Sequence, residues 1–281
     1  MTFSIVARAA DGRSFGIAVA SKFLAVGSVV PAAEAGAGAI ATQAYANAAY
    51  RPQALTLLRT GVSATDTLAG LVAADPGGAT RQAGVVGPDG PGATHTGTEC
   101  PDWAGGRAGD GYAIQGNILA GEQVVAEMES AWLAAGSGSF AARLLAALAA
   151  GDAAGGDRRG RQSAALYVVS PGGGYGGRTD VEVDLRVDDH PDPVAELRRL
   201  LDLHVLYLGR PDPASLLTLA GALAGEVRER LAALGHTGPA GEAGLDAALA
   251  DWAGIENYEE RLVPGRIDPL VLAKLREAQP R

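Results

Sequence analysis

Two short strands at the start of the chain, joined by a tight turn, constrain the fold most. Residues 2–8 read as a short alternating strand, and a second strand is expected at 15–22. Between them, Asp11 and Gly12 form a strong hairpin signal, because glycine readily adopts the backbone angles that such a turn needs. The chain is therefore expected to begin with an antiparallel hairpin, and a third apolar strand is expected at 36–42.

The remaining pattern places pairs of helices between groups of strands, as judged by apolar periods of 3.6 and 2. The expected order is helices at 50–60 and 64–74, strands at 81–87, 92–97 and 111–119, helices at 121–135 and 139–150, strands at 163–170 and 181–187, and a helix starting at 192–193. Ser63 is expected to cap the second helix with Asp66 at its third position, and Gly151 to end the fourth. This order predicts an α+β fold with antiparallel sheets and helices on their outer faces.

The C-terminal quarter differs in pattern from the rest. Residues 1–208 form the first predicted domain, 209–213 a linker, and 214–281 a small module of helical pattern. An exposed apolar patch on this module would suit docking, although packing of the same side chains into a core is the more ordinary explanation. The side chains in question are Trp252, Ile255 and Tyr258.

Composition excludes several classes of protein. Hydrophobic residues make up 47% of the 281, which supports a substantial core and argues against disorder. The net charge of −9, without a dominant basic patch, argues against nucleic-acid binding. Cys100 is the single cysteine, so no intrachain disulfide forms. The start lacks a signal peptide, and no stretch reaches the ~18 apolar residues of a membrane span. A cytoplasmic protein with no membrane partner is expected.

Three segments carry a resemblance to a known family. Residues 2–47, 112–117 and 156–163 resemble an uncharacterised bacterial family assigned to the N-terminal nucleophile (Ntn) hydrolase superfamily. The likeness runs in order from about residue 2 to residue 208, and it implies a four-layer αββα sandwich. Residues 214–281 are similar to a small helical domain named for peptidoglycan binding, which often follows this family's domain. Without a signal peptide, such a module would not meet the cell wall.

The resemblance implies a catalytic N-terminus. If Met1 is removed, Thr2 carries a free amine with an ordinary pKa of about 7.7–8.0, which can act as the base for its own hydroxyl. Lys22, at the end of the second strand, would lower the pKa of that amine or stabilise an oxyanion. Asn47 and the backbone beside it are the expected oxyanion donors. The plainer interpretations are a retained Met1, a solvated lysine, and an asparagine that only caps a helix.

Polar residues beside expected core strands are the candidates for substrate binding. They are Ser4, Gln43, Tyr45, His95, Gln115, Asn117, Asp157, Arg158 and Arg161. Neutral amides suit recognition of amide or carboxylate groups, and arginines pair with anionic groups. The alternatives are amides that tie strands together, an Arg–Asp pair that anchors a loop, and a structural histidine. Segment 188–192 is explained by a helix entry, so no metal is expected, and no cofactor motif is present.

The leading functional hypothesis is hydrolysis of an amide bond in a small molecule by the Thr2 nucleophile. The alternative is a non-catalytic metabolite- or partner-binding protein on the same fold, and a docking role for residues 214–281 is a third. The sequence is also compatible with assembly into a homo-oligomer. The site hypothesis also predicts a location: Thr2 should open on a cleft whose far side is formed by Gln115, Asn117 and residues 157–163, because buried polar groups must satisfy each other or a ligand.

Overall fold

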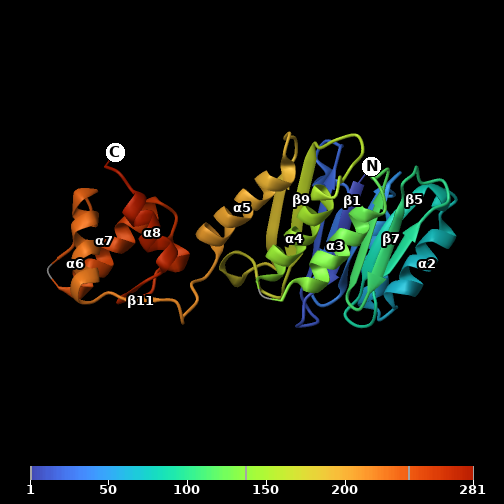
Figure 1. Cartoon of the computed structure of the whole chain (residues 1–281). Helices are drawn as coiled ribbons and strands as arrows, with labels where there is room; N and C mark the ends of the chain where they lie inside the picture. Colours follow the sequence, from blue (N-terminus) through green and yellow to red (C-terminus); the bar gives the residue numbers. More distant parts are fainter. Residues whose placement is uncertain (1, 137, 240, 281) are drawn as a thin grey trace. The chain divides into compact units, whose positions relative to one another are not determined.

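The computed structural model describes residues 2–136, 138–239 and 241–280, and these divide into two compact units, Met1–Leu201 and Asp202–Arg281. The division lies within one helix, α5 (Pro193–Leu208). The first unit is a mixed α+β structure built on antiparallel sheets (Figure 1). The coarse fold class predicted from the sequence is therefore confirmed for this unit.

Six strands in the described part of the first unit form one antiparallel sheet, in the order β10-β9-β2-β1-β8-β7. The strands are β1 (Thr2–Arg8), β2 (Phe15–Ser21), β7 (Gly105–Gly109), β8 (Tyr112–Asn117), β9 (Ser163–Val169) and β10 (Val181–Val187). The predicted hairpin is present, with Phe3 opposite Ala20. On its other side β1 pairs with β8, so that Thr2 lies opposite Asn117. Thr2 thus begins a central strand rather than an edge strand.

Four further strands among the described residues form a second antiparallel sheet, in the order β3-β4-β5-β6. They are β3 (Pro31–Glu34), β4 (Gly38–Ala44), β5 (Arg81–Val86) and β6 (Ala93–Thr96). In this sheet Gln43 lies opposite Gln82. The sequence pattern did not predict β3 or β7. One is a proline- and alanine-containing strand of four residues, and the other is mostly glycine, so neither has the composition typical of strands.

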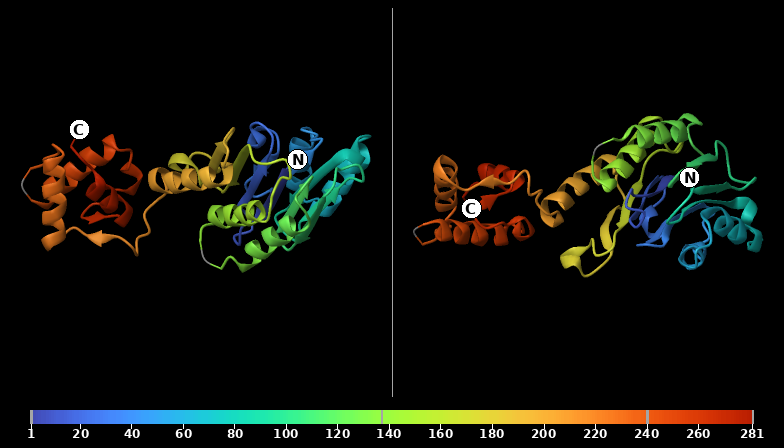
Figure 2. Two further views of the ribbon diagram at one scale, coloured as in Figure 1. Left: turned by 45° about the horizontal axis from the view of Figure 1, so that its top comes forward. Right: turned by 90° about the horizontal axis from the view of Figure 1, so that it is seen from below.

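The helices of the first unit cover the outer faces of the two sheets. Helices α3 (Gln123–Ala134) and α4 (Phe140–Ala153) pack together, and they contact β8, β1 and β2. Helices α1 (Tyr50–Arg59) and α2 (Ala64–Ala74) contact β4 and β5 of the other sheet. The sheets face each other through β1 with β4 and β5 with β8. In the right-hand view of Figure 2, the two helix pairs lie on opposite sides of the strands.

Two helix boundaries test the expectations about capping. Ser63 caps α2 as predicted, because its hydroxyl accepts a hydrogen bond from the Asp66 amide at 3.1 Å. The prediction that Gly151 ends α4 is wrong, since the helix continues to Ala153. Gly151 is buried, and a Cβ there would lie 2.6 Å from Met128 Cγ. The glycine therefore permits close packing of α4 on α3 and does not terminate the helix.

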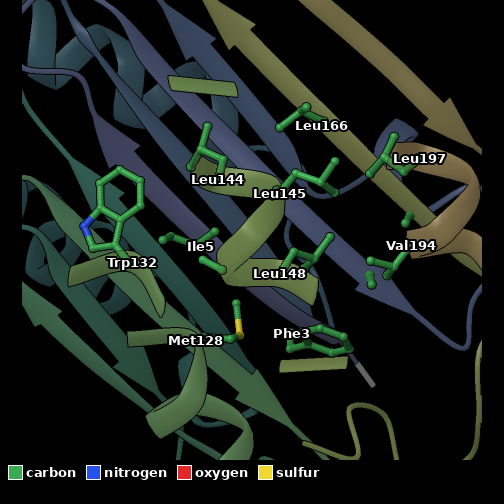
Figure 3. Packing of buried hydrophobic residues seen from close by; sticks show 14 of the residues in the cluster. Phe3, Ile5, Met128, Trp132, Leu144, Leu145, Leu148, Leu166, Val194 and Leu197 are labelled. Atoms are coloured by element: carbon green, nitrogen blue, oxygen red, sulfur yellow. The ribbon is translucent and has the colours of Figure 1, made fainter. Parts of the chain in front are cut away.

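The largest core lies between the six-stranded sheet and α3 and α4 (Figure 3). Phe3 and Ile5 of β1 point into it and are at most 1% exposed. Since side chains of a strand alternate between its two faces, Thr2, Ser4 and Val6 face the other sheet. Val6 belongs to the apolar cluster between the sheets. The polar pair Thr2 and Ser4 is thereby placed inside the molecule, at one end of this second core.

The second unit is a small, mainly helical module. Its elements are β11 (Leu217–Thr218), α6 (Gly221–Ala233), α7 (Glu242–Ile255), β12 (Arg266–Ile267) and α8 (Pro269–Glu277). Trp252 and Tyr258 are 3% and 6% exposed and pack in its core, whereas Ile255 is 51% exposed. Core packing therefore accounts for two of the three residues considered for docking. A short 3-10 turn in this unit is η4 (Glu259–Arg261), and those of the first unit are η1 (Val26–Ser28), η2 (Gly78–Thr80) and η3 (Tyr175–Gly177).

Candidate functional site at the Thr2 end

Thr2 lies at the start of β1, between the ends of its two neighbours β2 and β8. Its hydroxyl oxygen is 3.1 Å from the hydroxyl oxygen of Ser21, which ends β2, and either group can be the donor. The side chain is almost fully buried, with 6% of the residue exposed. A hydroxyl held by a second hydroxyl has a defined orientation, which a nucleophile requires.

Two amide side chains hold the Thr2 carbonyl oxygen. Gln43 donates to it from the four-stranded sheet at 3.2 Å, and Asn117 donates from β8 at 3.5 Å. Both side chains are about 1% exposed. The first peptide group of β1 is therefore fixed from both sheets at once, and the structure brings Thr2, Gln43 and Asn117 together.

Gln82 of β5 is the centre of this network, and the sequence analysis did not single it out. Its carbonyl oxygen accepts from the Gln43 amide at 2.8 Å and from the Asn117 amide at 2.9 Å. Its own amide donates to the Gly116 carbonyl at 2.7 Å and to the Thr96 hydroxyl at 2.9 Å. The available signal was a glutamine within an expected core strand, since a buried polar residue needs a partner.

Ser4 and Gln115 extend the network along β1 and β8. The Ser4 hydroxyl donates to Gln43 Oε1 at 2.7 Å and accepts from Gln115 Nε2 at 2.6 Å. Gln115 Oε1 is buried and has no hydrogen-bond partner among the described residues. It faces Gly84, where a Cβ would lie 2.0 Å from this oxygen. Glycine at position 84 is thus a packing requirement of Gln115.

The Asp157 segment lies beside the end of β2, next to Ser21. Asp157 accepts from the backbone amides of Lys22 at 2.7 Å and Arg159 at 2.8 Å, and its side chain is 2% exposed. The Lys22 ammonium donates to the Arg161 carbonyl at 3.2 Å. Asp157 therefore anchors a loop at the Thr2 end, in line with the structural alternative considered for this segment.

The arginines of this segment have different environments. Arg161 forms an ion pair with Asp152, and Nε lies 2.8 Å from Oδ1. Its pKa is raised, first by this hydrogen bond and then by the charge of Asp152. The Arg158 amide donates to the Ile118 carbonyl, and its side chain is exposed. Of these two candidates for an anionic substrate group, Arg161 is already neutralised within the protein.

Two predicted site residues, Asn47 and His95, have partners away from Thr2, and a third, Tyr45, is exposed. Asn47 donates to Asp75 Oδ2 at 2.9 Å and accepts from the Ala49 amide at 3.1 Å, just before α1. His95 lies on the opposite face of the four-stranded sheet from Gln82, and its Nε2 is 3.1 Å from the Gly78 carbonyl. Tyr45 is 66% exposed. Asn47 and His95 therefore have partners outside the Thr2 network.

The backbone adopts unusual angles where the strands of this site end. Ala25, Ala44 and Ile118 have positive φ values of 51°, 66° and 47°. Ala44 ends β4, Ile118 follows β8 directly, and Ala25 lies four residues after β2; these strands carry Gln43, Asn117 and Ser21 respectively. Positive φ is strained for residues with a side chain, and such strain clusters at functional sites. The same end of the unit thus combines buried polar groups with strained backbone.

The described residues lack two further features. No group of three or more His, Cys, Asp or Glu side chains within residues 2–136, 138–239 and 241–280 is placed to hold a metal ion. None of the helices described has both the length and the apolar character that a membrane crossing requires.

Comparison with known proteins places the first unit in a family. Residues 2–197 match the model of a family of unknown function, DUF1028. The chain belongs to the DUF1028 family. A solved structure of a DUF1028 protein from Silicibacter pomeroyi is 30% identical, covers 80% of this chain and 92% of that chain, and has a TM-score of 0.65. Residues 207–275 match a family described as "Putative peptidoglycan binding domain". No curated protein matches the chain.

Two hollows of the DUF1028 unit bear on the site. A small one of about 10 Å³ lies beside the Thr2 network and is lined in part by Phe3, Ser21, Asp157 and Arg161. A larger, open hollow of about 710 Å³ is lined by residues of α1 and α2 and by Asn47, Tyr50 and Asp75. Asn47 therefore borders the α1–α2 hollow.

Proposed function

We propose that the DUF1028 unit is an Ntn-type hydrolase that cleaves an amide bond in a small molecule, with Thr2 as nucleophile. One observation carries the proposal. Thr2 begins a central strand, its hydroxyl contacts Ser21, and its carbonyl is held by amides from both sheets. This degree of orientation exceeds what an ordinary strand-starting residue needs, and the strained strand ends around it are typical of functional sites.

The proposed reaction is acyl transfer to Thr2 followed by hydrolysis. After removal of Met1, the Thr2 amine accepts the hydroxyl proton while Oγ1 attacks the substrate carbonyl carbon. The C–N bond then breaks, and the proton passes from the amine to the leaving nitrogen. Water attacks the resulting ester, which releases the acid and restores Thr2. The Ser21 hydroxyl orients Oγ1, and backbone groups near Gln43–Asn47 are the proposed oxyanion donors.

We extend the proposal to the fold by assigning the unit to the Ntn superfamily as a four-layer αββα sandwich. Two facing antiparallel sheets with a helix pair on each outer face support this assignment. The position of Thr2 at the start of a central strand supports it as well, since an N-terminal nucleophile must lie where the sheets meet.

The first test asks whether Thr2 becomes the N-terminus. Intact-mass analysis of the purified protein should show loss of Met1, and periodate should oxidise the amino alcohol of a terminal threonine. The protein is then assayed for amine release from a panel of small amides, with Thr2→Ala as the inactive variant and Thr60→Ala, an exposed threonine, as the control. Active protein that retains Met1, or a fully active Thr2→Ala variant, overturns the mechanism.

A non-catalytic binding protein is the second candidate, and a specific observation favours it. Lys22 donates to the Arg161 carbonyl and Asn47 to Asp75, so two of the three predicted catalytic residues are engaged away from Thr2. Under this proposal the polar end binds a metabolite without turnover. Ligand binding that survives Thr2→Ala, together with no hydrolysis by the wild type, would support it.

A further inference from the structure

The Thr2 end also carries exposed apolar side chains. Phe23, Leu24 and Tyr45 are 51%, 60% and 66% exposed. Isolated exposed apolar residues are common, but bulky ones gathered around a polar site mark surfaces that bind a partner or ligand. Their position relative to Thr2 therefore matters.

Chain geometry keeps these residues near Thr2. Phe23 follows Ser21 by two residues, and Tyr45 follows Gln43 by two residues. Ser21 contacts the Thr2 hydroxyl, and Gln43 contacts the Thr2 carbonyl. Because each residue spans at most ~3.6 Å, two residues carry the backbone no more than about 7 Å from the Cα atoms of Ser21 and Gln43. One segment follows a strand of each sheet, so exposed apolar residues come directly after the strands that hold Thr2 from both sheets.

The backbone of both segments is fixed although the side chains are exposed. The Phe23 carbonyl accepts from the Ser163 hydroxyl, and the Ala25 amide donates to the Asp188 backbone carbonyl at 2.9 Å. The Tyr45 carbonyl accepts from Arg81 at 2.6 Å. Ala25 and Ala44, beside these residues, hold positive φ. A fixed backbone lowers the entropy cost of binding through these side chains.

Three charged groups near the end of β2 are engaged within the protein. Asp157 accepts from two backbone amides, and Arg161 is paired with Asp152. The Lys22 ammonium donates to the Arg161 carbonyl, on the Asp157 side. The contacts that Phe23, Leu24 and Tyr45 themselves offer a ligand are thus mainly apolar, and they favour an apolar group there.

We infer that Phe23, Leu24 and Tyr45 form an apolar rim that binds the uncharged, apolar acyl group of the substrate amide. The inference rests on the proposed function, because the rim is assigned to the acyl side of the bond that Thr2 attacks. The predicted substrates are amides of medium-chain or aromatic acids. Acetamides, which have too little apolar surface to cover the rim, are disfavoured.

Binding of simple amides to the full-length protein tests the rim without requiring turnover. Hexanamide and benzamide are compared with acetamide by ligand-observed NMR titration. Burial of several methylene groups should make hexanamide bind at least about tenfold more tightly than acetamide. The double variant Phe23→Ala/Tyr45→Ala should lose most of that preference. Tyr175→Ala is the matched control, since Tyr175 is 67% exposed on η3, and it should retain the preference.

Equal affinity for hexanamide and acetamide would contradict the proposed rim. A preference for hexanamide that persists in the double variant would contradict it as well. Circular dichroism of the variants shows that any loss is not due to unfolding. Hydrolysis is measured separately as release of ammonia. Selective hexanamide binding without hydrolysis keeps the rim and counts against the hydrolase proposal. Hydrolysis that proceeds equally with acetamide and hexanamide keeps the hydrolase and overturns the rim.

Discussion

At the scale of single residues, the site depends on one glutamine in the second sheet. Gln82 accepts from Gln43 and Asn117 and donates to the Gly116 carbonyl, all within a buried environment. An unpaired buried donor or acceptor costs about 1–3 kcal/mol. The main contribution of Gln82 to stability is therefore that it satisfies the buried polar groups around it. The residue most important for the geometry of Thr2 is therefore one that does not touch Thr2.

We predict that Gln82→Leu lowers the free energy of unfolding by about 2–4 kcal/mol, because it leaves several buried groups without partners. Urea denaturation followed by circular dichroism measures the change. Gln53→Leu, at an exposed position of α1, is the control and should change stability by no more than about 0.5 kcal/mol. A Gln82→Leu variant as stable as the control would show that the network contributes little.

Tyr112 provides a prediction on pH. Burial, and then the hydrogen bond to Glu129 at 2.9 Å, raise the pKa of Tyr112 to about 12. A pKa higher in the folded than in the unfolded chain stabilises the fold at low pH. The contribution of Tyr112 to the free energy of unfolding is thus fully present below about pH 10 and is lost as the pH rises towards about 12. Tyr112→Phe should reduce this loss, as measured by urea denaturation across that range. An unchanged alkaline slope would contradict the prediction.

At the scale of elements, the strand ends hold strain close to Thr2. Ala44 ends β4 with φ at 66°, directly after Gln43 and before Tyr45 of the rim. A left-handed backbone costs an L-residue about 1–2 kcal/mol, which glycine avoids. Ala44 therefore holds the backbone between Gln43 and Tyr45 in a conformation that costs the fold stability.

We predict that Ala44→Gly raises the free energy of unfolding by about 0.5–1 kcal/mol, because the relieved strain exceeds the added backbone entropy of the unfolded chain. Ala73→Gly, at an exposed position of α2, is the matched control and should lower it by about 0.5–1 kcal/mol. Thermal and urea unfolding measure both. Equal destabilisation by the two changes would show that the left-handed conformation is not strained.

At the scale of the whole molecule, α5 contributes to both units. Val194, Leu197 and Leu201 belong to the core of the first unit, and Leu206 belongs to that of the second. Each unit has its own apolar core, which is the physical requirement for independent folding. The helix therefore cannot be cut at an arbitrary position without loss to one of the cores.

We predict that a chain of residues 1–208 unfolds cooperatively, whereas a chain of residues 1–192 is less stable by several kcal/mol, because deleting a buried leucine side chain alone costs about 2–5 kcal/mol. Calorimetry of the two truncated chains measures the difference. The chain of residues 1–208 is the control, because it also lacks the helical module but keeps α5. Equal stability of the two chains would show that α5 adds nothing to the first core.

Sequence reasoning succeeded where local signals were strong. The Asp11–Gly12 turn, the Ser63 cap and the alternation in β10 each reflect the backbone preferences of a few adjacent residues, and the structure has all three. It failed where local composition was misleading. Strand β7 is mostly glycine and is held by its pairing with β8, and Gly151 continues a helix because α3 passes close to it.

The sequence by itself determined the α+β class, the N-terminal hairpin and the segments that supply Thr2, Gln43 and Asn117, because these follow from periodicity and from polar residues beside core strands. Only the tertiary structure decided that Gln82 joins them, while His95 faces away and Asn47 turns to Asp75. Strand register and the packing of one sheet on the other set these outcomes. Both depend on contacts between residues far apart in the chain, and no local pattern encodes them.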